Sequence, residues 1–388
     1  MSMTPPRANM AIAIDGGGTK GLLVAQALLS LEQAFGGKPL IESPNLKILT
    51  GTSTGAVISA CVAIGMRMAD LVALYKVFST KVFPPLVPAW LPAPIKRTAI
   101  AMIGLLHPSL FSSAPLVKLM RETIQKYTGN PDLTLGQLNT RLRVDQALVF
   151  TTVDLENRRT HFLKSYGQTD ADWKLWEAVL ASSAAPVDLP VLKRGDAFYA
   201  DGGAGSYGNP AYVAAREAVD WFKFPPSEVS VFSFGTGWVT RTGFEKSNGR
   251  PDRWRLLSWA LNIPYILIGD NARTQSLDVI DDYIQPYPTG QGMDFRRFQV
   301  GLEQDIDPFA PTDQTNAQLI SLGDEIGQRI LNDQHALSQP PNPKFDPEGL
   351  QPLLARYRQS MEIGKPEMNA QASGAQSTAA GNLEKVTV

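Results

Sequence analysis

Residues 46–64 read LKILTGTSTGAVISACVAI, and within them Ser53 lies between Gly51 and Gly55. The apolar run before the first glycine is typical of a buried strand, and the run after the second is typical of a buried helix. A G-x-S-x-G sequence between a strand and a helix is the pattern of a nucleophile elbow, a strained turn that exposes a serine hydroxyl. The pattern predicts acyl transfer at Ser53. An ordinary loop, in which Thr52 or Ser53 only caps the following helix, is the alternative.

A second glycine-rich loop lies nearer the N-terminus. Residues 10–14 read MAIAI, which predicts a first buried strand, and DGGGTKG follows at 15–21. Apolar residues then recur at helical spacing through residues 22–35. The order strand, loop, helix, strand, turn, helix favours an α/β fold with a parallel sheet covered by helices. The loop would then lie at the same sheet edge as the serine, where its backbone N–H groups are suited to bind an oxyanion.

The base that would activate the serine is less obvious from the sequence. The chain has three histidines: His107 precedes a proline in an apolar segment, His161 lies in a predicted strand, and His335 lies in a predicted polar helix. None of them follows a strand end, where catalytic bases commonly emerge. Asp201 does, because the short apolar run 197–200 ends there and two glycines follow. We therefore predict that Asp201 is the base.

These three segments together resemble the patatin-like phospholipase family, whose marks are a D-G-G-G-x-[RK]-G loop, a G-x-S-x-G elbow and a later D-G-[GA]. They stand here at residues 15–21, 51–55 and 201–203, in the family's order. The stretches 181–186 (ASSAAP), 209–210 (NP) and 294–299 (DFRRFQ) are also similar to family segments. The resemblance covers about residues 10–305. It implies a three-layer fold with a mostly parallel central sheet and helices on both faces.

The resemblance also implies a Ser–Asp dyad that works without histidine. In that arrangement Ser53 is the nucleophile, Asp201 accepts its proton, and the backbone N–H groups of the loop residues bind the oxyanion. The loop residues are Gly16, Gly17 and Gly18, and the elbow adds the N–H of Thr54. The implied substrate is the fatty-acyl ester of a phospholipid or other membrane lipid, reached by transient contact with a membrane surface. No cofactor and no metal are implied.

One residue departs from the family's usual pattern. Lys20 stands in the glycine loop where the family usually has arginine. Lysine keeps the positive charge but lacks the planar fork of donors, so the bracing of the loop by this side chain is expected to differ.

Three other functions stay open at this point. The chain order Ser53, Asp201, His335 matches that of a Ser-His-Asp esterase. The run DGGGTK also resembles the first phosphate loop of actin-like sugar kinases, although that loop joins two strands of a hairpin. The fold could instead serve as a lipid-binding or regulatory module without turnover.

The composition limits the class of protein. The 388 residues carry 36 Lys and Arg against 37 Asp and Glu, which argues against a protein that binds a nucleic acid polymer. The one cysteine, Cys61, excludes a disulfide framework and is expected to pack inside the helix after the elbow. The first nine residues lack the apolar core of a signal peptide, and no uncharged apolar run reaches about 18 residues. We therefore expect a cytoplasmic protein, with peripheral contact at the inner membrane.

The expected domain organisation follows from changes in composition along the chain. We predict an N-terminal tail at 1–9, a catalytic domain at 10–305, a helical extension at 306–364 and a disordered tail at 365–388. A proline-rich apolar lid or insert is predicted at 84–115. The apolar stretches 95–106 and 254–269 are compatible with core packing or with lipid contact. The sequence leaves open the oligomeric state and whether a small-molecule or protein activator is needed.

Overall fold

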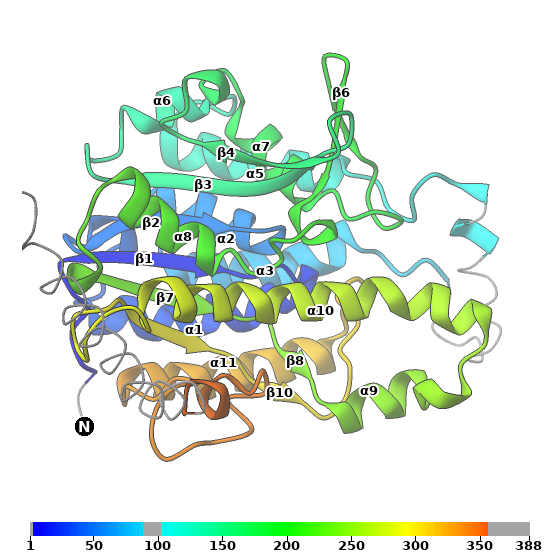
Figure 1. The fold of residues 1–388 in the computed structure, drawn as a ribbon. Helices are drawn as coiled ribbons and strands as arrows, with labels where there is room; N and C mark the ends of the chain where they lie inside the picture. The colour runs from blue at the N-terminus through cyan, green and yellow to red at the C-terminus, as the bar shows by residue number, and fades with distance from the viewer. Residues whose placement is uncertain (1–2, 88–101, 105, 356–388) are drawn as a thin grey trace, which may run out of the picture.

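The computed structural model describes residues 3–87, 102–104 and 106–355 of the chain (Figure 1). The predicted tail at 365–388 lies outside the described residues, as do the end of the predicted extension and positions 88–101 and 105 of the predicted lid. The rest forms an α/β fold in which a central sheet lies between two layers of helices, so the predicted fold class is confirmed.

The central sheet of the described residues has eight strands in the order β5-β6-β3-β2-β1-β7-β9, with β4 paired to β3. The pairs β2/β3, β1/β2, β1/β7 and β7/β9 are parallel, whereas β4, β5 and β6 join through antiparallel pairs. The strands are β1 Asn9–Ile14, β2 Leu46–Gly51, β3 Ala147–Asp154, β4 Arg159–Lys164, β5 Leu192–Arg194, β6 Ala197–Asp201, β7 Val229–Phe234 and β9 Asp294–Phe298; a separate small sheet pairs β8 Trp238–Val239 with β10 Gly301–Leu302.

The first strand explains why the sheet has helices on both faces. Every residue of β1 is buried, and its side chains alternate between two separate cores. Met10, Ile12 and Ile14 belong to one core, while Ala11 and Ala13 belong to the other. Because successive side chains of a strand point to opposite faces, a continuous apolar run requires cover on both sides.

The helices divide between these two cores. Those on the larger core are α1 Gly21–Ala34, α2 Thr54–Ala63, α3 Met68–Val82, α5 Ala114–Thr128, α6 Leu135–Asn139, α7 Leu175–Ser183 and α11 Asp313–Leu331. Those on the smaller core are α8 Ala211–Arg216 and the later part of α10 Leu256–Tyr283, and α9 Arg241–Asn248 precedes α10. The helix predicted at 22–35 and the strands predicted around the elbow therefore form where the sequence indicated.

The residues on either side of the predicted catalytic domain pack onto it. Helix α11 lies against α1, and its Gly323 and Gly327 come so close that a Cβ on either would overlap side-chain atoms of Gln26 or Ser30. Leu350, in the last described segment, belongs to the smaller core. At the other end, the side chain of Arg7 donates hydrogen bonds to three backbone carbonyls, one of them that of Pro226 at 3.1 Å.

Helix α10 is unusual because its first half exposes apolar side chains. Figure 1 shows this half projecting beyond the sheet, on the side where β1 and β2 end. The exposed side chains are Leu256, Trp259, Ile263, Ile266, Leu267 and Ile268, with Leu256 88% accessible. These six side chains are therefore not packed in the core, which was one of the two interpretations of the stretch 254–269. None of the helices in the described ranges is both long enough and apolar enough to span a bilayer.

The helix predicted around His335 is not present. Helix α11 ends at Leu331, and Asp333 has a φ of 56°, a left-handed conformation that does not continue a helix. His335 follows in a turn and is half-buried, with its ring 6.3 Å from that of Phe298 in β9. The polar residues 332–335 do not form the predicted helix because the turn after α11 folds back onto the sheet.

Candidate active site

The turn predicted at Ser53 forms between a strand and a helix. Ser53 joins β2 to α2 with a φ of 56°, a conformation that non-glycine residues rarely adopt and that marks strained turns. The two flanking glycines are required by space: a Cβ on Gly51 would overlap the backbone of Gly55, and a Cβ on Gly55 would overlap the carbonyl oxygen of Ile14. The turn therefore presses close against the ends of β1 and β2.

The strand topology brings Ser53 and Asp201 together. The first half of β3 pairs with β2, in a parallel register that ends with Gly51 opposite Phe150. The second half of β3 pairs with β6, in an antiparallel register that ends with Asp201 opposite Thr152. Since β4 occupies the other edge of β3, β2 and β6 share one edge and run toward each other. Their ends meet at Ser53 and Asp201.

The carboxylate of Asp201 is buried beside the serine hydroxyl. Only 5% of the residue is accessible, and its Oδ1 accepts a hydrogen bond from the N–H of Gly203 at 2.7 Å. Burial raises the pKa of Asp201 to about 6, against the opposing effect of hydrogen bonds from the side chain of Ser53 and from Gly203. A carboxylate in a buried site is a stronger base than one in water, and it remains largely ionised at pH 7.

Neighbouring hydroxyl groups hold the turn on both sides. The N–H of Ser53 donates to Ser182 Oγ at 3.0 Å, and Ser183 Oγ donates to the carbonyl of Ser53 at 3.1 Å. Thr52 Oγ1 lies 2.6 Å from the carbonyl oxygen of Tyr207, in the loop after Asp201. The end of α7 and the loop after β6 therefore fix the elbow, which gives a structural reason for the family-like stretch 181–186.

The glycine loop lies beside the elbow, but its three glycines are not equivalent. The N–H of Gly16 donates to the carbonyl of Gly208 at 2.9 Å, so it is already engaged. This differs from the prediction that Gly16 donates to an oxyanion. In the part of the chain that the structure describes, no hydrogen bond uses the N–H groups of Gly17, Gly18 or Thr54. These three remain the candidate donors.

Close packing explains the glycines of this loop. A Cβ on Gly17 would overlap Thr236 Oγ1, which itself donates to the carbonyl of Gly16 at 2.7 Å. Gly18 has a φ of 57°, and a Cβ there would lie 2.5 Å from the carbonyl oxygen of Pro308. The loop is therefore held between residue 236 on one side and the segment around residue 308 on the other.

Lys20 is buried at the end of this loop. Burial lowers its pKa, and the negative charges of Asp305 and Asp307 oppose that effect. The N–H of Thr19 also donates to the carbonyl of Pro308 at 2.9 Å. The positive charge that the family usually carries as arginine here faces the acidic segment 305–307.

A buried arginine that the sequence did not single out lies beneath the loop. Arg297 in β9 is fully buried and binds Asp15, the first residue of the glycine loop, through both of its terminal nitrogens at 2.8 and 2.6 Å. It also binds Glu348 from the last described segment at 2.6 Å. The family-like stretch DFRRFQ at 294–299 contained the signal for Arg297, but nothing in the sequence pointed to Glu348.

Across the residues that the structure describes, no hydrogen bond joins any of the three histidines to Ser53 or Asp201. His107 is exposed, and His161 Nε2 lies 3.0 Å from Asp170 Oδ1 beside β4. Burial and the neighbouring charge of Arg296 lower the pKa of His335 to about 4. Because β9 lies three strands from β2 at a spacing of about 4.8 Å, roughly 14 Å separates the serine from the strand that packs on His335. No triad of Ser53, Asp201 and His335 forms.

Two further expectations concern Cys61 and metal ions. Cys61 is buried in α2, as predicted, and burial raises the pKa of its thiol to about 12. Among the described residues, no group of three or more His, Cys, Asp or Glu side chains is arranged to hold a metal ion.

The geometry of the elbow and the glycine loop agrees with a comparison of the sequence with known families. The model described as "Patatin-like phospholipase" matches residues 12–215, which is just over half of the chain. The chain belongs to the patatin-like phospholipase family. The match includes the glycine loop, the elbow and Asp201, and it ends before β9 and the segment that carries Glu348.

Curated relatives and a solved structure extend this comparison. A cGAMP-activated phospholipase of Vibrio cholerae is 27% identical over 58% of this chain and 63% of the relative, and a cUMP-AMP-activated phospholipase of Escherichia coli is 28% identical over 58% and 64%. The chain thus spans less than two thirds of the length of both. The crystal structure of VipD from Legionella pneumophila has a TM-score of 0.42 at 16% identity, covering 86% of this chain and 68% of that one.

Proposed function

We propose that this protein is a lipid acyl hydrolase of the phospholipase A type, with Ser53 as nucleophile and Asp201 as base. The observation that carries the proposal is the strained turn at Ser53, whose side chain hydrogen-bonds to a buried carboxylate with a pKa raised to about 6. A serine hydroxyl needs such a neighbour because it is a weak nucleophile while it keeps its proton.

In the first step of the proposed mechanism, Ser53 Oγ attacks the ester carbonyl and Asp201 takes the hydroxyl proton. The N–H groups of Gly17, Gly18 and Thr54 donate to the oxyanion of the tetrahedral intermediate. Collapse of this intermediate releases the lipid alcohol, which receives the proton from Asp201, and leaves the acyl group on Ser53.

In the second step, water replaces the alcohol. Asp201 removes a proton from the water as it attacks the acyl-serine, and the same three N–H groups stabilise the new oxyanion. The fatty acid leaves, and Ser53 Oγ recovers its proton from Asp201. One carboxylate thus serves as base and acid in both halves of the cycle.

The exposed apolar half of α10 supports a lipid substrate. Ile268 is 44% accessible, and a Cβ on Gly208 would lie 3.8 Å from its Cγ2. Gly208 in turn accepts the hydrogen bond from Gly16 in the glycine loop. The apolar surface from Leu256 to Ile268 therefore approaches the proposed site, where we propose that it contacts the membrane during catalysis.

The family also suggests regulation by a small molecule. The names of the matched relatives state activation by cGAMP and by cUMP-AMP. We extend this to the present chain and propose that a cyclic dinucleotide increases its hydrolytic rate.

The actin-like sugar kinase is a less suitable alternative. The glycine loop of this chain leads from β1 into α1, whereas the phosphate loop of an actin-like kinase joins two strands of a hairpin.

Release of fatty acid from phosphatidylcholine vesicles, with and without cGAMP or cUMP-AMP, tests the proposal. The wild-type protein is expected to release fatty acid and to gain a fluorophosphonate adduct on Ser53, detected by mass spectrometry. Ser53→Ala should lose both signals. A folded wild-type protein that shows neither under any of these conditions would instead be a lipid-binding module without turnover.

Flotation with vesicles tests the lipid surface separately. Trp259→Glu and Ile266→Glu are expected to weaken vesicle binding while leaving hydrolysis of a soluble short-chain ester unchanged. The exposed Val144 offers a matched control, since Val144→Glu places the same charge before the start of β3, at the sheet edge opposite to the elbow. Equal binding by all three variants would rule out the first half of α10 as the membrane contact.

A further inference from the structure

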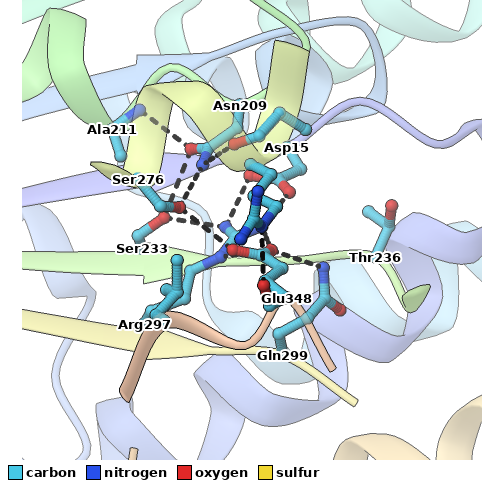
Figure 2. A network of polar contacts seen from close by, with 12 residues as sticks. Asp15, Asn209, Ala211, Ser233, Thr236, Ser276, Arg297, Gln299 and Glu348 are labelled. Atoms are coloured by element: carbon cyan, nitrogen blue, oxygen red, sulfur yellow. Dashed lines mark hydrogen bonds and ion pairs between the residues drawn. The ribbon is translucent and has the colours of Figure 1, made fainter. Parts of the chain in front are cut away.

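The buried arginine beneath the glycine loop uses its whole set of donors. Figure 2 shows the guanidinium of Arg297 between two carboxylates. Nη1 donates to Asp15 Oδ1 and Ser233 Oγ, both at 2.8 Å, and Nη2 donates to Asp15 Oδ2 and Glu348 Oε1, both at 2.6 Å. Nε donates to Glu348 Oε1 at 3.0 Å. A guanidinium has five N–H donors, and each of them has a partner here.

Asp15 connects the Arg297 guanidinium to the glycine loop. It is the residue between β1 and Gly16, and its own N–H donates to the carbonyl of Phe234 at 3.0 Å. Its carboxylate is bound in a bidentate manner, which fixes its direction as well as its distance. The position of the Arg297 plane therefore restricts where the loop of Gly17 and Gly18 begins.

Glu348 is itself held in place. Its Oε2 accepts a hydrogen bond from Ser276 Oγ at 3.1 Å, and its backbone carbonyl accepts one from Arg273 Nε at 2.8 Å, both from α10. Its carboxylate is almost fully buried, with 1% of the side chain accessible. Two of the five donors of Arg297 depend on Glu348, and without it they would be buried and unsatisfied.

We propose that Glu348, from the segment beyond the matched family region, is a positioning residue that orients the glycine loop through Arg297 and Asp15. By accepting from Nε and Nη2, Glu348 fixes the rotation of the guanidinium, and the opposite edge of the guanidinium fixes Asp15. The consequence for catalysis rests on the proposed role of the loop as oxyanion hole. The predicted effect of Glu348 on the order of residues 15–21 does not depend on that role.

The test compares Glu348→Ala with Glu348→Gln, which keeps an oxygen acceptor at the same position. In Glu348→Ala, kcat is expected to fall about 10-fold with little change in KM, because an oxyanion donor acts on the transition state. Amide hydrogen exchange at residues 15–21 is expected to become faster, while exchange in β7 stays unchanged. Glu348→Gln should restore most of both properties.

The surface ion pair of Glu325 with Lys344, at 2.7 Å, provides the matched control. Glu325→Ala also removes a carboxylate that binds the segment around Glu348, but it leaves Arg297 untouched, so kcat and loop exchange should stay at wild-type values. Equal losses in Glu325→Ala and Glu348→Ala would overturn the proposal, because they would reflect undocking of the segment. Unchanged loop exchange in a folded Glu348→Ala would overturn it as well.

Two outcomes need separate treatment. If Glu348→Ala does not fold, Glu348→Asp, which withdraws the carboxylate by one methylene, takes its place, and exchange at 15–21 equal to wild type would then overturn the proposal. If the wild-type protein hydrolyses no ester, the proposed function fails, yet the exchange measurements still decide whether Glu348 orders the loop.

Discussion

Asp201 and Asp15 are both buried carboxylates at the same edge of the sheet, and burial raises the pKa of each to about 6. Their surroundings differ. Asp201 is hydrogen-bonded to the Ser53 side chain and the Gly203 N–H, neither of them charged. Asp15 is bound by the Arg297 guanidinium, whose stabilising effect is partly offset by the charge of Glu348.

The comparison shows that a similar pKa can accompany different functions. Asp201 is basic because it is buried without a cation, and a hydroxyl proton is within its reach. Asp15 is engaged with a cation on both oxygens, so it is suited to anchoring the loop and not to proton transfer. A raised pKa alone would not distinguish a base from an anchor, whereas the partners do.

The largest expected effect is on the rate of ester hydrolysis and concerns Asp201, the proposed base. Asp201→Asn should lower ester hydrolysis by roughly 10³-fold or more, as loss of a catalytic base does in serine hydrolases. Because folding raises the pKa of Asp201 from 3.8 to about 6, its ionisation lowers stability progressively between these pH values, and the loss is complete above about pH 6. The variant should therefore be at least as stable as wild type in urea at pH 8. Near-normal hydrolysis by Asp201→Asn would show that Asp201 is not the catalytic base.

The next effect concerns the stability of the arginine network. Arg297→Met should lower the free energy of unfolding by about 3–5 kcal/mol at pH 8, because Asp15 and Glu348 would be buried without their cation. Burial already raises the pKa of Asp15 to about 6, and loss of the cation would raise it further, so stability should recover as the pH falls and Asp15 takes up a proton. Urea denaturation at pH 8 and pH 5 measures this. An equal loss at both values would mean that packing, and not charge, is responsible.

The pH dependence of the reaction sharpens the assignment of Asp201. Since the base must be ionised, kcat/KM should be level above about pH 6 and fall tenfold per unit below it. Burial raises the pKa of the neighbouring Asp188 to about 7, and the negative charges of Asp307 and then Asp201 add to this effect. Because Asp188 is largely protonated at the pH where Asp201 titrates, Asp188→Asn should leave the acid limb near pH 6. If it abolishes the limb, Asp188 is the titrating group.

The smallest effect concerns the second support of the glycine loop. Thr236→Val removes the hydroxyl that binds the carbonyl of Gly16 and should cost about 1 kcal/mol, or roughly fivefold in kcat. Thr236→Ser keeps the hydroxyl and should remain near wild type. If Thr236→Val lowers kcat more than Glu348→Ala does, Thr236 and not the arginine network is the main support of the loop.

The sequence predicted the parts of the site whose geometry is local. The turn at Ser53, the glycines at 16–18 and the strand that ends at Asp201 each depend on a few consecutive residues, and each forms as expected. The prediction failed where the chain folds back on itself, as at His335, or where exposure depends on neighbours, as in the first half of α10. The engaged N–H of Gly16 was also missed, because its partner Gly208 lies far along the chain.

Taken by itself, the sequence determined which chemical groups are available and the backbone turns that present them, since steric limits on glycine and serine act within a few residues. Only the tertiary structure decided which groups meet. Ser53 reaches Asp201 because β2 and β6 approach each other along one edge of β3, and Asp15 reaches Arg297 across 282 positions of chain because β9 joins the sheet beside β7. Such pairings depend on the order of the strands in the sheet. Hydrogen bonds between segments that are distant in the sequence set this order, and local conformational propensity does not.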